Sequence, residues 1–168
     1  MAMREVLLPE YDQEMAATRR LLERVPEDRL DWTPHPKSFT LGGLLSHLVN
    51  IPSWIPMTLE QEVLDMAPEG KEPWKTPQLE TRAAWLAAFD TNVSQGRASL
   101  ERLEDARLQE IWTLKAGAQT YFSAPKGGVL RSFALNHFIH HRAQLTVYLR
   151  LLDVPLPGIY GPSADEQM

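Results

Sequence analysis

Apolar residues recur at the spacing of an amphipathic helix along four stretches of the chain. The first stretch covers residues 6–25, and Pro9 falls in its first turn, where a proline is tolerated. Its apolar positions lie three, four or seven residues apart: Leu8, Tyr11, Met15, Leu22 and Val25. The pattern predicts a helix that ends at the Pro26-Glu-Asp sequence.

A second helix is expected to begin at about Leu41. The segment before it, residues 31–39 (DWTPHPKSF), holds two prolines and cannot stay helical for long. Thr40 fits the N-cap position, because a short hydroxyl side chain there accepts a hydrogen bond from an unpaired N–H group of the first turn. The sequence LGGLLSHLVNI then supplies the apolar face of the helix.

Two prolines interrupt this second helix. Pro52 and Pro56 predict a kink or break, after which the sequence TLEQEVLDM is expected to continue helically towards Met66. Residues 67–78 contain three prolines and one glycine, which predicts a connecting loop.

The third helix is predicted over residues 79–103, where Gly96 weakens the middle by roughly 1 kcal/mol relative to alanine. Its apolar stripe consists of Trp85, Phe89, Val93 and Leu100. Residues 105–126 lose the helical period, and a short extended or hairpin excursion is expected around WTLKAG and QTYFS. The last helix is predicted over residues 129–152 and ends before two prolines, after which a turn-rich tail packs back or stays mobile.

These four segments predict an all-α fold. A four-helix bundle is the natural arrangement, with a long connection between the second and third helices and the short hairpin excursion before the last. The 168 residues, 43% of them apolar, suit a single domain covering residues 1–168.

The composition excludes several classes of protein. The net charge is −5 and no segment gathers the basic residues into a stripe, so nucleic acid is not an expected partner. No apolar run approaches the roughly 18 residues that a membrane span needs, so we expect a cytoplasmic protein without a membrane partner. The chain has no cysteine, so a transition metal would be held by histidine and carboxylate side chains alone.

Three of the five histidines fall on apolar helix faces. On the last helix His137 and His141 lie about 40° apart, one turn above the other, in the centre of the core-facing stripe. His47 lies on the apolar face of the second helix. His140 falls at the edge of the stripe as a rim residue, and His35 lies between two prolines in a loop.

Each buried histidine has two explanations. An isolated one is commonly a core residue hydrogen-bonded to a polar group, but three together suggest a shared divalent cation, because coordination offsets the desolvation of the rings. Other metal motifs do not fit: Phe138 stands where a zinc protease has glutamate, and Ala134 and Leu44 stand where a di-iron bundle has glutamate. Ser46 is expected to be a helix-surface serine rather than a nucleophile.

The order of three sequence segments resembles the DinB family, also called DinB/YfiT-like proteins, over essentially the whole chain. The segments are DWTPHPKSFTLGGLLSHL, NHFIHHRAQLTVYL and VPLPGIYGPSADE. The resemblance implies a four-helix bundle, often dimeric, with a divalent metal on three histidines, here His47, His137 and His141. It also implies, for some members, transfer of thiols such as bacillithiol or mycothiol. Ala143, where many members have glycine, and Pro52 depart from the pattern.

Such a site allows more than one chemistry. Three neutral imidazoles leave the 2+ charge of the ion, expected to be zinc or nickel, free to attract an anion. A small-molecule substrate joined to a low-molecular-weight thiol is the preferred expectation, with metal-dependent hydrolysis and metal binding without turnover as alternatives. The expected pocket residues are Trp54, Ile51, Leu44 and Gln144, while Arg142 points away from the histidines and is expected to pair structurally.

A second apolar face on the last helix suggests a homodimer. Leu135, Ile139 and Leu149 lie outside the core stripe, and an isolated bundle rarely exposes this much apolar surface. Cover by the C-terminal tail or by residues 105–126 is the competing explanation.

Overall fold

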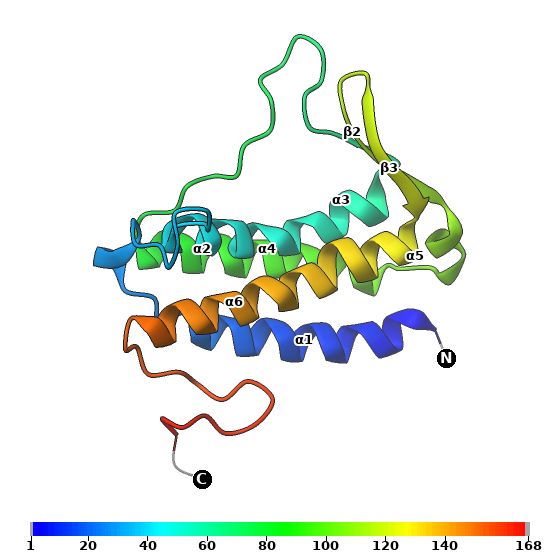
Figure 1. Ribbon diagram of the computed structural model, residues 1–168. Coiled ribbons are helices and arrows are strands. Elements are labelled where there is room, and N and C mark those ends of the chain that lie inside the picture. Colours follow the sequence, from blue (N-terminus) through cyan, green and yellow to red (C-terminus); the bar gives the residue numbers. More distant parts are fainter. Residues whose placement is uncertain (1, 167–168) are drawn as a thin grey trace.

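Four helical segments make up most of the protein, whose computed structural model describes residues 2–166 (Figure 1). The first is α1 (Met3–Leu22) and the third is α4 (Arg82–Glu101). The second joins α2 (Leu41–Asn50) through the short turn η2 (Ile51–Ser53) to α3 (Trp54–Glu60). The fourth joins α5 (Lys126–Val129) through η4 (Leu130–Asn136) to α6 (His137–Leu151). Single 3-10 turns follow α1 and α4: η1 (Glu27–Arg29) and η3 (Asp105–Gln109).

The expected helices are present, with shifted ends. The first begins at Met3 instead of residue 6, which moves Pro9 to its second turn. It ends at Leu22, yet Val25 beyond it is still fully buried. The third begins at Arg82, where the Thr81 hydroxyl accepts a hydrogen bond from the backbone N–H of Ala84. None of the helices in residues 2–166 is long and apolar enough to cross a membrane.

Gly96 lies at a close contact between helices. A Cβ atom at this position would lie 2.6 Å from the hydroxyl of Tyr11 and 3.0 Å from the carbonyl oxygen of Pro52. The Tyr11 hydroxyl donates a hydrogen bond to the carbonyl of Val93, which ties α1 to α4. The intrinsic helical cost of this glycine is therefore offset by packing that a larger residue would prevent.

The helical continuation towards Met66 is wrong. α3 ends at Glu60, and residues Val63–Asp65 form strand β1 instead. This strand lies parallel to β2 (Ile111–Ala116), which pairs in antiparallel fashion with β3 (Gln119–Pro125) in the order β1-β2-β3. The predicted hairpin before the last helix is confirmed. The predicted all-α class is incomplete, because it leaves out this small sheet, in which β1 pairs with the distant hairpin.

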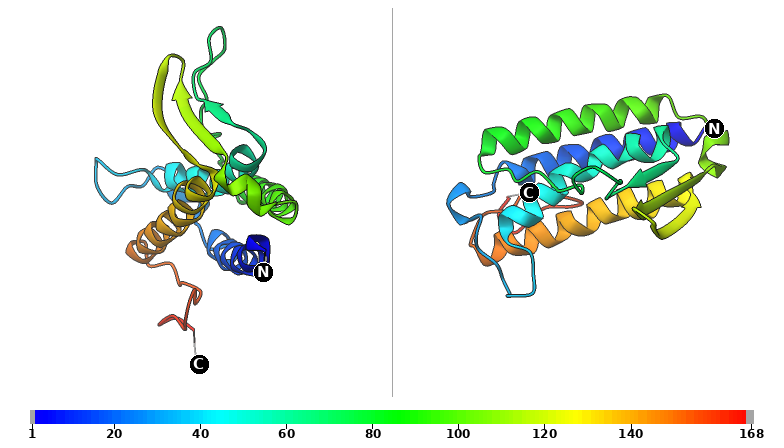
Figure 2. Two further views of the ribbon diagram at one scale, coloured as in Figure 1. Left: turned by 90° about the vertical axis from the view of Figure 1, so that its right-hand side faces the viewer. Right: turned by 90° about the horizontal axis from the view of Figure 1, so that it is seen from above.

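The sheet lies outside the helical bundle. In Figure 1 the β2–β3 hairpin and the loop after β1 project from the same side of the helices, and the left-hand view of Figure 2 shows the same. The expected loop over residues 67–78 is confirmed, since none of these residues is helical or in a strand. Together the loop and the hairpin form a wall beside α3 and η4.

The last helix contains a π-helical stretch. Residues Leu130–Asn136 (η4) widen the helix directly before His137, a distortion that often accompanies functional sites. The widening shifts the faces on either side of it relative to a regular helix. Leu135, assigned to an outer face, is accordingly 4% exposed in the core of the single chain.

The outer apolar face of the last helix is largely covered by the chain itself. Leu149 is fully buried and Ile139 is half-buried, because α6 packs against both α1 and α2. The homodimer stays a prediction. The apolar surface from which it was inferred is largely buried within the single chain.

A buried ion pair joins α1 to α6 and to the C-terminal tail. Glu14 and Arg142 are 6% and 2% exposed and bond to each other directly. Tyr160 completes the network: its hydroxyl donates to the Glu14 carboxylate at 2.9 Å, and its ring lies 5.0 Å from the Arg142 guanidinium. The expected structural role of Arg142 is confirmed, and this part of the tail packs back on the bundle.

Arg142→Met is expected to lower the free energy of unfolding by about 3–5 kcal/mol, because it leaves the Glu14 carboxylate buried without its partner. The matched control is Arg131→Met, which removes the half-exposed ion pair of Arg131 with Glu10 on the same two helical segments and should lose less than about 1 kcal/mol. Urea-induced unfolding of both variants measures the difference. Equal losses in the two variants would contradict the importance of burial.

Candidate metal centre

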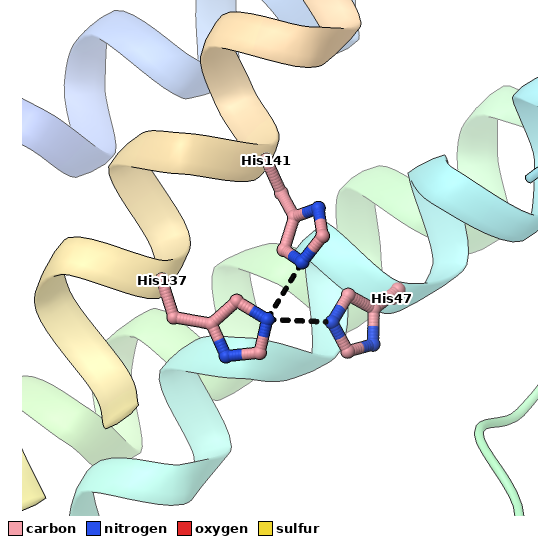
Figure 3. Close-up of side chains that lie close together, drawn as sticks. All are labelled: His47, His137 and His141. Atoms are coloured by element: carbon pink, nitrogen blue, oxygen red, sulfur yellow. Dashed lines mark hydrogen bonds between the residues drawn. The ribbon is translucent and has the colours of Figure 1, made fainter. Parts of the chain in front are cut away.

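Three histidine side chains from two helices converge on one point (Figure 3). His47 comes from α2, and His137 and His141 come from successive turns of α6. The Nε2 atom of His137 lies 3.2 Å from that of His47 and 2.6 Å from that of His141. One ligand atom of each lies within 4.8 Å of the others, so the group is able to hold a metal ion.

Helix structure places these rings. The Thr40 hydroxyl accepts a hydrogen bond from the Gly43 N–H at 3.1 Å, which fixes the first turn of α2, as predicted. The four-residue spacing of His137 and His141 puts both rings on one side of α6. The site therefore depends on local helix geometry and on the packing of α2 against α6.

Hydrogen bonds orient two of the rings. Nδ1 of His137 faces the carbonyl oxygen of Phe133 at 3.3 Å, and Nδ1 of His141 faces the side-chain oxygen of Gln144 at 2.7 Å. Because both partners are acceptors, each Nδ1 is the protonated nitrogen, and each Nε2 keeps its lone pair for the centre of the site. Hydrogen-bond acceptors in this position fix the ring orientation of metal-binding histidines in proteins, so Gln144 is a positioning residue for His141.

The donor set fits a divalent transition metal. The Nε2 atoms of His137 and His141 lie 2.6 Å apart, close enough for both lone pairs to be directed at one cation. Nitrogens on one zinc ion at about 2.0–2.1 Å lie about 3.3 Å apart in a tetrahedron, close to the His47–His137 separation of 3.2 Å.

The electrostatic surroundings keep the three rings neutral. Burial, with smaller contributions from His141 and His137, lowers the pKa of His47 to about 4. Burial also lowers the pKa of His137 and of His141, although the hydrogen bonds to Phe133 and Gln144 act in the opposite direction. Neutral imidazole is the form that binds metals, so no proton has to leave these rings at pH 7.

The group contains no carboxylate among the residues that the structure describes. Three neutral ligands leave the full charge of a divalent ion uncompensated, so an anionic ligand would be favoured in a remaining position.

Aromatic side chains surround the triad. The ring of Trp54 lies 5.5 Å from that of His47 and 5.3 Å from that of His137. Phe39 stacks on His47 at 5.9 Å, and the hydroxyl of Tyr148 donates to the Phe39 carbonyl. These contacts restrict rotation of the His47 and His137 rings.

Two cavities open beside the triad. One, of about 180 Å³, is lined mainly by apolar side chains and includes His47 and Trp54. The other, of about 340 Å³, includes His141 and the more polar side chains of Lys37, Ser38 and Gln144. The triad thus lies between an apolar and a polar compartment.

The expected pocket residues separate into two groups. Trp54 lines the apolar cavity and Gln144 the polar one. Leu44 and Ile51 are almost completely buried in the hydrophobic core and line neither cavity, because α2 turns that side towards the bundle.

The remaining candidates lie outside the group. His35 and His140 are exposed. Ser46 is 1% exposed rather than on the surface, and its hydroxyl accepts a hydrogen bond from the Leu79 N–H, so it fastens the loop before α4.

Several residues beside the triad were not anticipated from the sequence. Phe133, Leu114, Met66 and Trp74 line the apolar cavity from η4, the hairpin and the loop after β1. The one available signal was Trp74, a large aromatic residue in a loop rich in proline and charge.

Comparison with known proteins agrees with the fold. A family model described as the DinB family matches residues 2–167. The chain belongs to the DinB family. It is 30% identical over 163 residues to an uncharacterized Bacillus subtilis (strain 168) protein, YrdA, covering 95% of this chain and 89% of that relative.

Two solved DinB-like structures share the fold. One, from Bacillus cereus ATCC 10987, has a TM-score of 0.66 at 23% identity and covers 93% of this chain and 97% of its own. The other, YjoA from Bacillus subtilis, has a TM-score of 0.65 at 17% identity and covers 96% and 98%. The overall fold is thus found in other DinB-like proteins.

Alanine substitution of the five histidines tests the site. His47→Ala, His137→Ala and His141→Ala are each expected to lose the bound divalent ion, because each removes one of three ligand atoms that converge. His35→Ala and His140→Ala are the matched controls and should keep one ion per chain. Elemental analysis of protein purified without a histidine tag measures the stoichiometry. Full retention in His137→Ala, or loss in His140→Ala, would show that the ligands are misassigned.

The metal-free protein should lose stability as the pH falls from about 6.5 to about 4, in the range bounded by the ordinary and the folded pKa of His47. In this range the unfolded chain binds a proton at His47 that the folded chain does not, so the unfolded state is favoured. His47→Gln should flatten the dependence, whereas the exposed His35→Gln should not. Urea midpoints measured with chelator across this pH range provide the test. If the midpoint of His47→Gln falls with decreasing pH as steeply as that of the wild-type protein, the assignment to His47 is refuted.

Proposed function

We propose that the protein is a divalent-metal-dependent transferase that joins a low-molecular-weight thiol to a small electrophile. The observation that carries the proposal is a triad of neutral imidazoles, which leaves the charge of an ion available for an anionic sulfur. The chain has no cysteine, so the sulfur comes from a second small molecule. Zinc and nickel are the proposed ions, since imidazole ligands suit both.

The residues of the site have distinct roles in this proposal. His47, His137 and His141 hold the ion, and Gln144 fixes the orientation of His141. A bound divalent ion stabilises the thiolate form of a thiol whose pKa in water is about 8.5. Trp54 and Phe39 flank the triad and limit the access of competing water.

The polar cavity suits the thiol. Lys37, Ser38 and Gln144 line it next to His141, and the ammonium group of Lys37 can attract the carboxylate that many cellular thiols carry. The electrophile then approaches from the apolar side of the triad. This arrangement separates the two substrates by their polarity.

The reaction balances without a further reactant. With an epoxide as electrophile, the sulfur–hydrogen bond of the thiol and one carbon–oxygen bond break, and a carbon–sulfur bond forms. The thiol proton is released to solvent and a proton from solvent reaches the alkoxide, so the product is a hydroxy thioether. No carboxylate base belongs to the group among the described residues, which favours a nucleophile that is already ionised over the deprotonation of water.

The cobalt-substituted protein tests the proposal. Titration with cysteine, bacillithiol or mycothiol is expected to change the visible spectrum of the cobalt ion, because sulfur joins its ligands. Turnover of an electrophile should require both the ion and the thiol, and His47→Ala should abolish it while His35→Ala preserves it. If no thiol changes the spectrum, or if the electrophile disappears equally fast without thiol, the transferase proposal fails, and the second result would indicate a hydrolase.

A further inference from the structure

The apolar cavity beside His47 has the properties of a binding site for an aromatic ring. Its volume is about 180 Å³. A cavity of about 150 Å³ lined by aliphatic and aromatic side chains stays dry and accommodates benzene. The cavity is therefore large enough for one aromatic ring with a short substituent. We call it the aromatic chamber, defined by His47, Trp54, Met57, Leu64, Met66, Trp74, Thr76, Leu114 and Phe133.

One wall of the chamber is an aromatic stack. The rings of Trp54 and Phe133 are parallel within 20°, with centroids 4.8 Å apart. Phe122 and Trp112 support Phe133 from behind, at 5.7 and 5.9 Å. These contacts hold the two inner rings in place, so a planar ligand meets a preformed surface.

The opposite wall comes from the long connection between α3 and α4. After β1, residues 66–81 of this connection form no helix or strand, and loops of this length are uncommon in compact domains and are usually functional when ordered. Here the connection supplies Leu64, Met66, Trp74 and Thr76 to the chamber. These four side chains are half-buried and are among the least exposed of the connection.

Specific hydrogen bonds hold this wall against the hairpin. The Met66 N–H donates to the Lys115 carbonyl at 2.8 Å, and the Trp74 N–H donates to the Met66 carbonyl at 2.7 Å. The Asp65 carboxylate accepts from the N–H of Gly117 at 2.9 Å, at a turn where the positive φ of 57° favours glycine. The wall is thus fastened at β1.

The chamber adjoins the reaction centre. His47 lines it directly, and Trp54 contacts both His47 and His137. A substituent on a ring bound against Trp54 therefore points to the triad from the apolar side. The polar cavity lies on the His141 side, so a ring in the chamber leaves the proposed thiol position free.

We infer that the aromatic chamber makes the protein selective for electrophiles that carry a single aromatic ring close to the reactive carbon. The inference rests on the proposed transferase function. Phenyl oxirane represents this class: the thiol sulfur bonds to a ring-opened epoxide carbon, the carbon–oxygen bond breaks, and the oxygen takes up a proton. Methyl oxirane undergoes the same reaction but has no ring to bury.

Direct binding tests the chamber without any turnover. Ethylbenzene, which has the ring but no reactive group, is expected to bind the metal-loaded protein and to perturb the NMR signals of the Trp54 and Trp74 indoles. Leu114→Phe reduces the free volume and should weaken binding by about 10-fold or more. Tyr121→Ala is the matched control, because Tyr121 is an exposed aromatic residue of the same hairpin that does not line the chamber. Absence of ethylbenzene binding to the wild-type protein would overturn the inference.

Turnover then measures selectivity. The measured quantity is kcat/KM for phenyl oxirane divided by kcat/KM for methyl oxirane. This ratio is corrected by dividing it by the ratio of the two uncatalysed rates with the same thiol, and the corrected ratio is expected to exceed about 10. Trp74→Ala should reduce this ratio about 10-fold, mainly through KM for phenyl oxirane, while Tyr121→Ala keeps it.

The two proposals fail in different ways. If ethylbenzene binds but neither oxirane reacts with any thiol, the transferase proposal fails and the chamber as a ring-binding site stands. If both oxiranes react with the thiol at the ratio found in solution, the transferase stands and the inferred selectivity is overturned.

Discussion

The structure depends on bringing three imidazole nitrogens to one point inside a largely apolar bundle without charging them. Burial supplies the neutral state, which the lowered pKa of His47, about 4, reflects most strongly. The Nε2 atoms of His137 and His141 lie only 2.6 Å apart, so the two rings have to be held together by the surrounding helices. The helices therefore have to be fixed by interactions away from the triad. The N-cap of α2 at Thr40 and the close α1–α4 contact at Gly96 are two such interactions.

A third interaction away from the triad fixes the rotation of α6 about its axis. Arg142 follows His141 directly and points to the other side of the helix, where it bonds to the buried Glu14 of α1 and to Tyr160 of the tail. A buried charge has few alternative partners, so this pair specifies one orientation more strictly than apolar contacts would. Because the two side chains belong to neighbouring residues, the orientation of Arg142 also determines where His141 points. The conformation of the C-terminal segment is in this way linked to the geometry of the metal centre.

The sequence predicted the features that depend on local periodicity. The faces of the helices follow from a rotation of about 100° per residue, so His47, His137 and His141 could be grouped, and Thr40 could be recognised as a cap. The features that depend on distant pairing were not accessible. TLEQEVLDM has the composition of a helix, but Val63–Asp65 pairs with a strand contributed by residues far along the chain. The π-helical widening before His137 likewise has no signature in the apolar pattern, and it displaced Leu135 from the predicted outer face into the core.

The part of the site that the sequence predicted, the three histidines, has a different role from the part that it did not predict, the wall of the apolar cavity. The ligand atoms lie on helices whose structure is local, so the metal centre can persist while the connection between α3 and α4 varies. The wall of the aromatic chamber lies on that connection. It is held by three residues of parallel pairing, by the Asp65 contacts to Ala67 and Gly117, and by the backbone hydrogen bonds of Met66 and Trp74. In the proposed transferase, a change in this connection would alter which electrophile fits without moving any of the three imidazole nitrogens. Selectivity in that proposal can therefore change separately from metal binding, because the wall and the triad are stabilised by different interactions.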